Sequence, residues 1–254
     1  MNPSVRPTNV PLPSSSPPGM VSPDILAPAE RQPENPIWVD LTPLNRAALS
    51  TIQEQYGLPS EVMTYFLLHY PSAKLIHAGP VLFLVTFLVT PSSRSLFTLR
   101  ELKICVSSTV VATMCGPAGK ALPDLAQHFP LPSLSGERTG QLLHGLLEET
   151  VRSYEAIVRT VEGRGRGEVP REETQRRRKQ VEKLVRFLRE EQSFLGNVTR
   201  EGRKLLAAEE SRQIRSIAER VGVLARTAWE TTLERKVLAA HPAIPGATQA
   251  GDDA

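Results

Sequence analysis

Short runs of hydrophobic residues in the first half of the chain predict a sheet. Strands are expected at residues 37–41, 74–78, 81–90, 95–106 and 108–114. The run at residues 81–90 is apolar at nearly every position, as in a strand that is covered on both faces, and Gly79-Pro80 before it is typical of a hairpin turn. In residues 95–106 apolar and polar side chains alternate imperfectly, which favours a strand near an edge of the sheet.

Helical spacing of apolar residues predicts short helices between and after these strands. The first runs from Pro43 to Gly57, where proline suits the first helical position and glycine suits the residue that ends the helix. The second runs from Pro59 to Pro71, and a further short helix is expected at residues 122–129. The strands and the short helices together predict an α/β head.

The second half of the chain has the periodicity of long amphipathic helices. Apolar residues recur at steps of three and four over residues 137–162, 171–198 and 209–238. The glycines between Gly163 and Gly167 separate the first two helices. Three long helices after a strand-rich segment predict the α+β class, with a mixed sheet flanked by helices and followed by long antiparallel stalk helices.

The pattern divides the chain into four parts. Residues 1–35 are rich in Pro and Ser and are expected to be disordered, because they cannot bury enough apolar surface to offset the entropy of ordering. A proline-rich ligand for a partner domain is the alternative for this segment. The α/β head spans residues 36–136, the long-helix stalk region spans 137–240, and residues 241–254 are expected to form a loose tail.

The composition is that of an ordinary globular protein, with 40% hydrophobic residues, 22% charged residues and a formal net charge of +3. So small a charge does not call for an anionic partner. The longest apolar stretch, residues 81–89, is far shorter than the ~20 residues of a membrane-spanning helix, and the N-terminus lacks the apolar core of a signal peptide. Cys105 and Cys115 fit no disulfide framework or zinc pattern. We therefore expect a cytoplasmic protein without a membrane span.

No constellation of residues in the sequence indicates catalysis. Motifs that cradle phosphates or present a catalytic serine do not occur. The five histidines are scattered, without a second ligand one helical turn away, and are His69, His77, His128, His144 and His241. We expect these to be surface or core histidines, and we do not expect an enzyme.

The second long helix carries the strongest basic signal, from Arg176 to Lys179. A nucleic-acid site would need aromatic residues or a known binding fold near this run, and the sequence provides neither. Acidic residues are interleaved on the same helix, at Glu172, Glu173, Glu182, Glu190 and Glu191. The sequence therefore predicts a solvated, ion-paired helix face and no nucleic-acid partner.

Carboxylates on the third long helix are the candidate metal ligands. They are Glu209, Glu210, Glu219 and Glu230. Hard cations prefer several oxygen ligands, so one helix cannot form a site alone, whereas two chains that meet along this helix could form one. Glu219 is the residue that we assign to a metal, and a solvated helix face is the alternative.

Several short strings follow one another in a series that resembles one protein family. IWVDL at residues 37–41 is followed by YGLPSEV at 56–62, SAKL at 72–75 and GPVLFLV at 79–85. In type and order these strings, together with the helix at 140–154, resemble the cytoplasmic domain of CorA-type magnesium transporters. The resemblance extends from about residue 37 to residue 238. It implies the α+β fold of that domain, with its sheet, flanking helices and stalk.

The chain also departs from the family pattern. In CorA-type proteins the last long helix continues into a pore helix that ends in Gly-Met-Asn, but here His241-Pro242 follows the helix and the triplet occurs nowhere. The family places acidic residues between subunits, where magnesium gates the pore. The corresponding stalk position falls near Ser216 and Glu219, whereas the loop at residues 91–93 carries no acid.

The resemblance implies a protein of the magnesium and divalent metal ion transport family, reduced to the cytoplasmic domain. Such a protein would regulate transport or sense cations and would not itself be a pore. Mg²⁺ is the one cofactor expected, at Glu219. Expected partners are copies of the chain, joined through the stalk helices, or a membrane transporter that would hold the protein at the membrane. The alternative is a helical interaction scaffold unrelated to ion transport.

Overall fold

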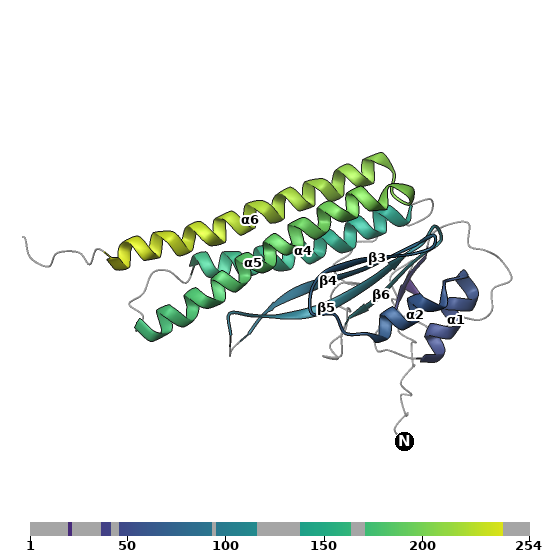
Figure 1. The fold of residues 1–254 in the computed structure, drawn as a ribbon, viewed down its shortest axis with the longest axis horizontal. Coiled ribbons are helices and arrows are strands. Elements are labelled where there is room, and N and C mark those ends of the chain that lie inside the picture. Colours follow the sequence, from purple (N-terminus) through teal and green to yellow (C-terminus); the bar gives the residue numbers. More distant parts are fainter. Residues whose placement is uncertain are drawn as a thin grey trace, which may run out of the picture.

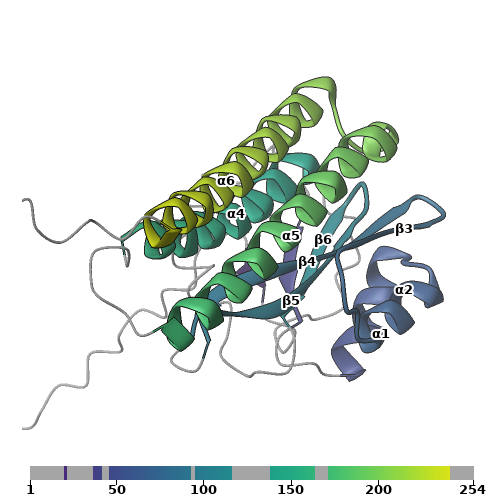
Figure 2. The same cartoon turned by 60° about the vertical axis from the view of Figure 1, so that its left-hand side comes forward.

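The structure is a computed structural model that describes residues 20–21, 37–41, 46–92, 95–115, 138–163 and 171–240. It confirms the α+β class: a mixed sheet lies between two short helices on one face and a layer of three long helices on the other (Figures 1 and 2). The helix expected at residues 122–129 and the tail at 241–254 lie outside the described residues.

The sheet has six strands in the order β1-β2-β6-β5-β4-β3. Their bounds are Met20–Val21 for β1, Ile37–Asp40 for β2, Lys74–Ala78 for β3, Val81–Pro91 for β4, Phe97–Val106 for β5 and Val110–Cys115 for β6. Strands β3 to β6 form an antiparallel meander, whereas β2 joins β6 in parallel and β1 joins β2 in parallel. Gly79 has a φ of 59° and forms the turn between β3 and β4, as predicted.

The expectation that residues 95–106 form a strand near an edge is wrong. β5 lies inside the sheet, between β4 and β6. Its alternation is imperfect because two charged residues on it, Glu101 and Lys103, are buried and have polar partners. A polar residue in a strand indicates exposure only when nothing else in the fold can satisfy it.

β1 lies within residues 1–35, the segment expected to be disordered. Its two residues pair with β2, Met20 with Trp38 and Val21 with Val39. This short strand was not predicted, because two residues are too few for a periodic pattern. The rest of residues 1–35 lies outside the described part of the chain.

The helices agree with the predicted segments. The short helices are α1 (Arg46–Tyr56) and α2 (Ser60–Leu67), and the long helices are α4 (Thr139–Gly163), α5 (Arg171–Glu201) and α6 (Ala208–Ala240). A 3₁₀ turn, η2 (Gly202–Lys204), follows α5. α4 packs across β4, α5 reaches β3, and α6 lies on α4 and α5, on the side away from the sheet (Figures 1 and 2).

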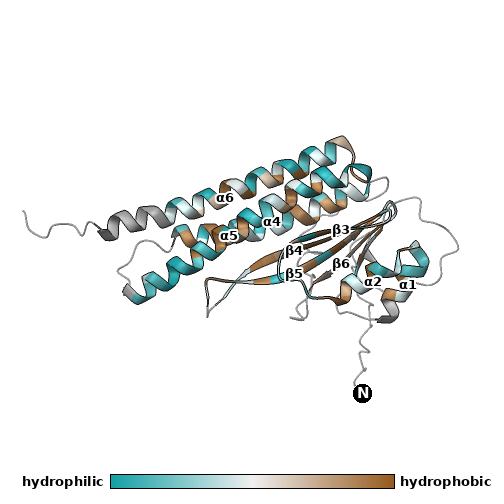
Figure 3. Cartoon of the chain, in the orientation of Figure 1, coloured by the Kyte–Doolittle hydropathy of each residue, from teal (hydrophilic) through white to brown (hydrophobic). Residues whose placement is uncertain are grey.

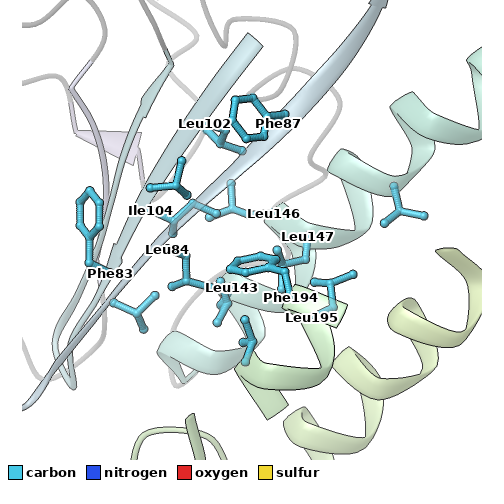
Figure 4. Close-up of a cluster of buried hydrophobic side chains, with 14 of the residues drawn as sticks. Phe83, Leu84, Phe87, Leu102, Ile104, Leu143, Leu146, Leu147, Phe194 and Leu195 are labelled. Carbon is cyan, nitrogen blue, oxygen red and sulfur yellow. The ribbon is translucent and has the colours of Figure 1, made fainter. Parts of the chain in front are cut away.

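A single cluster of buried hydrophobic side chains extends from the sheet into the long helices. Leu84 of β4 points toward Leu143 and Leu146 of α4, whereas Phe83 points the opposite way (Figure 4). Phe83 contacts the ring of Phe66 on α2 edge to face, at 5.1 Å. β4 is therefore covered on both faces, as its apolar sequence predicted.

The long helices are amphipathic, whereas the strands are mostly apolar (Figure 3). Each helix buries one side in the helical layer and turns charged residues to solvent. The division into a head and a stalk region near residue 137 stays a prediction, since residues 116–137 are not described. In the described parts, head and long helices share one core.

Candidate functional site

Glu219, the predicted metal ligand, lies on the exposed side of α6. It belongs to a row of exposed residues spaced alternately four and three apart, which we call the α6 outer row: Arg212, Ser216, Glu219, Val223, Arg226 and Glu230. Such spacing keeps side chains on one side of a helix. Val223, at the centre of the row, is 48% exposed, which is high for an apolar side chain within an ordered helix.

The four carboxylates predicted as candidate ligands do not form one site. Glu210 is buried, and its Oε2 accepts a hydrogen bond from the backbone N–H of Ala207 at 2.6 Å, so it caps the start of α6. Glu209 is exposed and pairs with Arg212. Glu219 and Glu230 are 11 residues apart and both exposed.

A single chain does not fit a resident magnesium ion at Glu219. Mg²⁺ requires near-octahedral oxygen coordination, and Glu219 is the only carboxylate in its part of the outer row. Among the described residues, no three His, Cys, Asp or Glu side chains are grouped so that they could hold a metal ion. A cation at Glu219 would need ligands from a second chain.

An ion-pair cluster fixes the direction in which Glu219 faces. The adjacent residue, Arg220, points from α6 to α4 and donates from Nη1 to both carboxylate oxygens of Glu148, at 2.7 and 2.8 Å. Its Nη2 donates to Glu155 at 2.7 Å. The hydrogen bonds that Arg220 donates to Glu148, and secondarily to Glu155, raise its pKa above the ordinary value. Because Arg220 is held on the inner side, Glu219 is directed to solvent.

The basic run on α5 forms an ion-paired face, as predicted. Arg177 pairs with Glu173, and Arg178 donates to Glu182 at 2.8 Å. Both pairs are four residues apart on one helix. Each pair links adjacent turns of α5, and the glutamates neutralise part of the positive charge of the basic run.

Glu191 is the exception on α5, and its prediction as a solvated residue is wrong. Its side chain is 1% exposed and faces the sheet. Its Oε2 accepts a hydrogen bond from the hydroxyl of Thr86 on β4 at 2.9 Å. The hydroxyl of Tyr154 on α4 lies 3.3 Å from that of Thr86 and donates to the carbonyl oxygen of Phe87 at 2.8 Å. We call Thr86, Tyr154 and Glu191 the Glu191 network.

Burial changes the acidity of this network. It raises the pKa of the Glu191 carboxyl from 4.5 to about 8, because a charge is poorly solvated away from water. The pKa of Tyr154 is also raised well above its ordinary value, chiefly by burial and then by the charge of Glu191. The residue signal that could have located Glu191 is its position between the buried Leu188 and Leu195, at steps of three and four.

A second buried polar cluster lies on the α2 side of the sheet. Lys103 of β5 donates to the carbonyl oxygen of Phe66 at 2.8 Å and to that of Leu68, and so caps the end of α2. Glu101 lies 3.7 Å from the Lys103 ammonium and accepts a hydrogen bond from the backbone N–H of Tyr70 at 2.9 Å. We call this the Glu101–Lys103 cluster. Burial lowers the pKa of Lys103, and Glu101 counteracts the shift.

Among the residues that the structure describes, the cysteines and histidines do not converge on a catalytic site. Cys105 is completely buried, and burial raises the pKa of its thiol to about 12, so it is not a nucleophile at neutral pH. His69, before β3, contacts Glu101, and His77, within β3, contacts Glu201, each at 3.1 Å. His128 and His241 lie outside the described residues, and His144 is half-buried on α4.

A groove of about 460 Å³ runs between α5 and α6. Val185 and Trp229 supply its apolar part, and its polar lining is Glu182, Arg186, Arg189, Glu190 and Ser193. No residue of the α6 outer row lines it. The helical layer therefore offers two separate surfaces, the groove and the outer row.

The described helices differ in composition from membrane-spanning helices. Over the described ranges, none of the helices combines the length with the apolar composition that crossing a membrane requires. The three long helices have the length, with 25, 31 and 33 residues, but charged side chains recur along each of them.

Comparison with known proteins gives matches by structure only. No family model and no curated protein matches the sequence. The complete CorA magnesium transporter from Methanocaldococcus jannaschii superposes with a TM-score of 0.65 at 16% identity, over 85% of this chain and 70% of that one. The cytoplasmic domain of ZntB from Vibrio parahaemolyticus superposes with a TM-score of 0.62 at 10% identity, over 82% of this chain and 88% of that one. The chain has the fold of the CorA soluble domain.

Full-length CmaX shares this CorA-like fold as well. Its structure superposes with a TM-score of 0.63 at 12% identity, over 80% of this chain. The chain spans 65% of the length of CmaX, whereas it spans 88% of the ZntB cytoplasmic domain. The fold expected from the sequence resemblance is therefore confirmed, and in ZntB the similar region is the cytoplasmic domain.

Proposed function

We propose that this chain serves divalent metal ion transport as a regulatory or cation-sensing domain on the cytoplasmic side of the membrane, and not as a pore. The observation that carries the proposal is the CorA-like fold, which extends over 85% of the chain. The CorA and ZntB structures are described as those of a magnesium transporter and of a cytoplasmic domain. A domain with this fold and an acidic residue on its outermost helix is suited to respond to cations.

The α6 outer row is the surface through which the domain would associate. α6 packs against α4 and α5 with its other sides, and Arg220 joins its inner side to Glu148 and Glu155 of α4. Alternating steps of four and three residues are those by which one helix packs along another. The partner would be a copy of this chain or a membrane transporter with a similar helix.

Association along this row would bring copies of Glu219 together. Carboxylates at close range repel each other, and a divalent cation between them would remove the repulsion and supply the several oxygen contacts that one chain does not have. Mg²⁺ would then favour the associated state because it binds that state and not the single chain.

The test is the mass of the protein in solution with and without millimolar Mg²⁺, measured by light scattering, together with its melting temperature. We expect a larger mass and a higher melting temperature with Mg²⁺. Glu219→Gln should remove both responses, because the amide is neutral and a poorer ligand. Glu209→Gln is the matched control, since Glu209 is also exposed on α6 but pairs with Arg212, and it should retain both responses.

Constant mass and melting temperature in the presence of Mg²⁺ would contradict the cation-sensing role. The second candidate function, a helical interaction scaffold unrelated to ion transport, is favoured by the groove between α5 and α6, which has Val185 and Trp229 in its lining. A scaffold would associate to the same extent with Mg²⁺ and with a chelator, and Glu219→Gln would leave its mass unchanged.

A further inference from the structure

The only carboxyl group on the buried side of α5, within its described residues, faces the centre of the sheet. Glu191 accepts a hydrogen bond from the Thr86 hydroxyl of β4, and that hydroxyl lies 3.3 Å from the one of Tyr154 on α4, so the network joins three elements. Phe187, one turn earlier on α5, packs edge to face on the Tyr154 ring at 5.3 Å and keeps water away from that side. The position is therefore enclosed by packed side chains.

The hydrogen bonds around Glu191 are too few for a carboxylate. Its Oε2 has one bond, from Thr86, and its Oε1 is buried with no hydrogen-bond partner among the described residues. A buried carboxylate ordinarily needs a cation or several donors. The basic residues of α5 pair on its outer face instead, as Arg178 does with Glu182.

A protonated carboxyl fits the same positions of the heavy atoms better. The acid O–H can donate to the Thr86 hydroxyl, which is then free to donate to the Tyr154 oxygen, while Tyr154 donates to the carbonyl oxygen of Phe87. Each hydroxyl in this order gives one hydrogen and receives one. With an ionised Glu191, both Thr86 and Tyr154 donate outward and their 3.3 Å contact has no hydrogen in it.

We propose that Glu191 is a proton-binding site between α5 and the sheet, and that loss of its proton in mildly alkaline solution loosens α5 from β4. In that step the O–H bond of the carboxyl breaks, the proton passes to water or hydroxide, and the electron pair stays on the carboxylate. The carboxylate is then stabilised only if α5 moves enough to admit water or a cation.

The surroundings of Glu191 determine the pH range of this change. The pKa of Glu191 is raised to about 8, first by burial, and the charge of Glu190 on the same helix adds to the rise. The neighbouring hydroxyl groups of Thr86 on β4 and Tyr154 on α4 lower it partly. Within the described part of α6, no ionisable group contributes. The proton is therefore retained at neutral pH and lost near pH 8.

The sign of the effect on stability follows from proton linkage. Between pH 4.5 and about 8 the folded protein holds a proton on Glu191 that the unfolded chain has lost. Stability from this group is complete below pH 4.5, decreases as the pH rises, and is lost as the pH passes through about 8. α6 packs along α5, so a displacement of α5 would also displace the α6 outer row. The proposal does not depend on the proposed function.

Melting temperatures of the intact chain from pH 5 to pH 9, measured for the natural protein and for Glu191→Gln, test the proposal. The amide has the shape of the acid but does not ionise. We expect nearly equal melting temperatures at pH 5 and a melting temperature several degrees lower for the natural protein at pH 9. Glu190→Gln is the matched control, because Glu190 is adjacent but exposed. It should show the same fall as the natural protein, at a slightly lower pH because its charge no longer raises the pKa of Glu191.

Parallel pH curves for the natural protein and Glu191→Gln would overturn the proposal. Hydrogen exchange followed by mass spectrometry gives a second measurement, since it reports α5 separately from the sheet. After correction for the intrinsic effect of pH, peptides of α5 around residues 184–198 should lose protection between pH 7 and pH 9 in the natural protein only. Equal protection in both proteins at pH 9 would also overturn it.

Discussion

Two buried acidic residues lie on opposite sides of the same sheet, and they are satisfied in different ways. Glu101, 6% exposed, faces α2 and lies 3.7 Å from the Lys103 ammonium, with a backbone N–H and a histidine as further partners. Glu191, 1% exposed, faces the long helices and has only hydroxyl groups near it. On the α2 side an ion pair compensates the buried carboxylate, whereas on the side of the long helices a bound proton keeps the carboxyl neutral at pH 7.

The difference teaches that burial alone does not decide whether a carboxyl is charged. On the α2 side, Lys103 compensates the charge and is itself held by two carbonyl oxygens at the end of α2. On the other side none of the described basic residues contributes to the environment of Glu191, and burial raises the pKa of its carboxyl to about 8. The partner that the fold supplies determines the charge state.

The largest expected effect comes from removal of the cation on the α2 side. Lys103→Met leaves Glu101 buried without its counter-charge and leaves the carbonyl oxygens of Phe66 and Leu68 without a donor. We expect a loss of about 3–5 kcal/mol in the free energy of unfolding, measured by urea titration at pH 7.

A double variant sharpens this prediction. Lys103→Met combined with Glu101→Gln removes both charges, so it should be more stable than Lys103→Met alone. If the double variant is less stable than the natural protein by the sum of the losses of the two single variants, the two residues do not act as a pair and the comparison fails.

A smaller effect is expected on the side of the long helices, where no charge has to be compensated at neutral pH. Tyr154→Phe removes the hydroxyl that donates to the carbonyl oxygen of Phe87 and contacts Thr86. We expect a loss of about 1–2 kcal/mol at pH 6, by the same titration. Tyr65→Phe is the control, since Tyr65 is only half-buried on α2, and it should change the stability by less. Equal losses in the two variants would contradict the role of the Tyr154 hydroxyl.

The smallest effect is expected where water can replace the missing partner. Arg220 is bound to Glu148 and Glu155, but all three side chains are partly exposed. Arg220→Met should cost about 0.5–1 kcal/mol, and less at high salt, because solvent screens such pairs. Arg212→Met, which breaks a pair at an exposed position, should cost less still. A loss for Arg220→Met as large as that for Lys103→Met would show that exposure is not what separates the two clusters.

The strands and helices could be predicted closely from the sequence because each has a strong local pattern. The apolar run of β4, the hairpin at Gly79 and the periodicity of α5 are properties of neighbouring residues. The order of the strands in the sheet could not be predicted in the same way. β5 has a mixed pattern, and its place inside the sheet depends on the polar groups that α2 brings to Glu101 and Lys103.

The candidate site shows the same division. The sequence shows that Glu219 has no second carboxylate within one helical turn, and the apolar Ile217 and Val221 beside it predict its outward direction. The contact of Arg220 with α4 could not be read from the sequence. Glu191 was mistaken for a solvated residue because it follows another glutamate in a charged helix. Its spacing of three and four residues from Leu188 and Leu195 indicates a buried position. The hydroxyl groups that make burial of its carboxyl possible lie on β4 and α4, far away in the sequence.

The parallel pairing of β2 with β6 has a consequence for the order in which the protein is made. The Trp38 indole N–H donates to the Thr113 hydroxyl across 75 positions of sequence, and at about 5–20 residues per second this interval takes about 4–15 s to synthesise. During that time β3, β4 and β5 can form their hairpins. The indole of Trp38 is one of the largest side chains of the finished core, and it stays exposed to solvent until β6 has been synthesised. The nascent chain therefore exposes the apolar segment around Trp38, to which a chaperone could bind until β6 emerges.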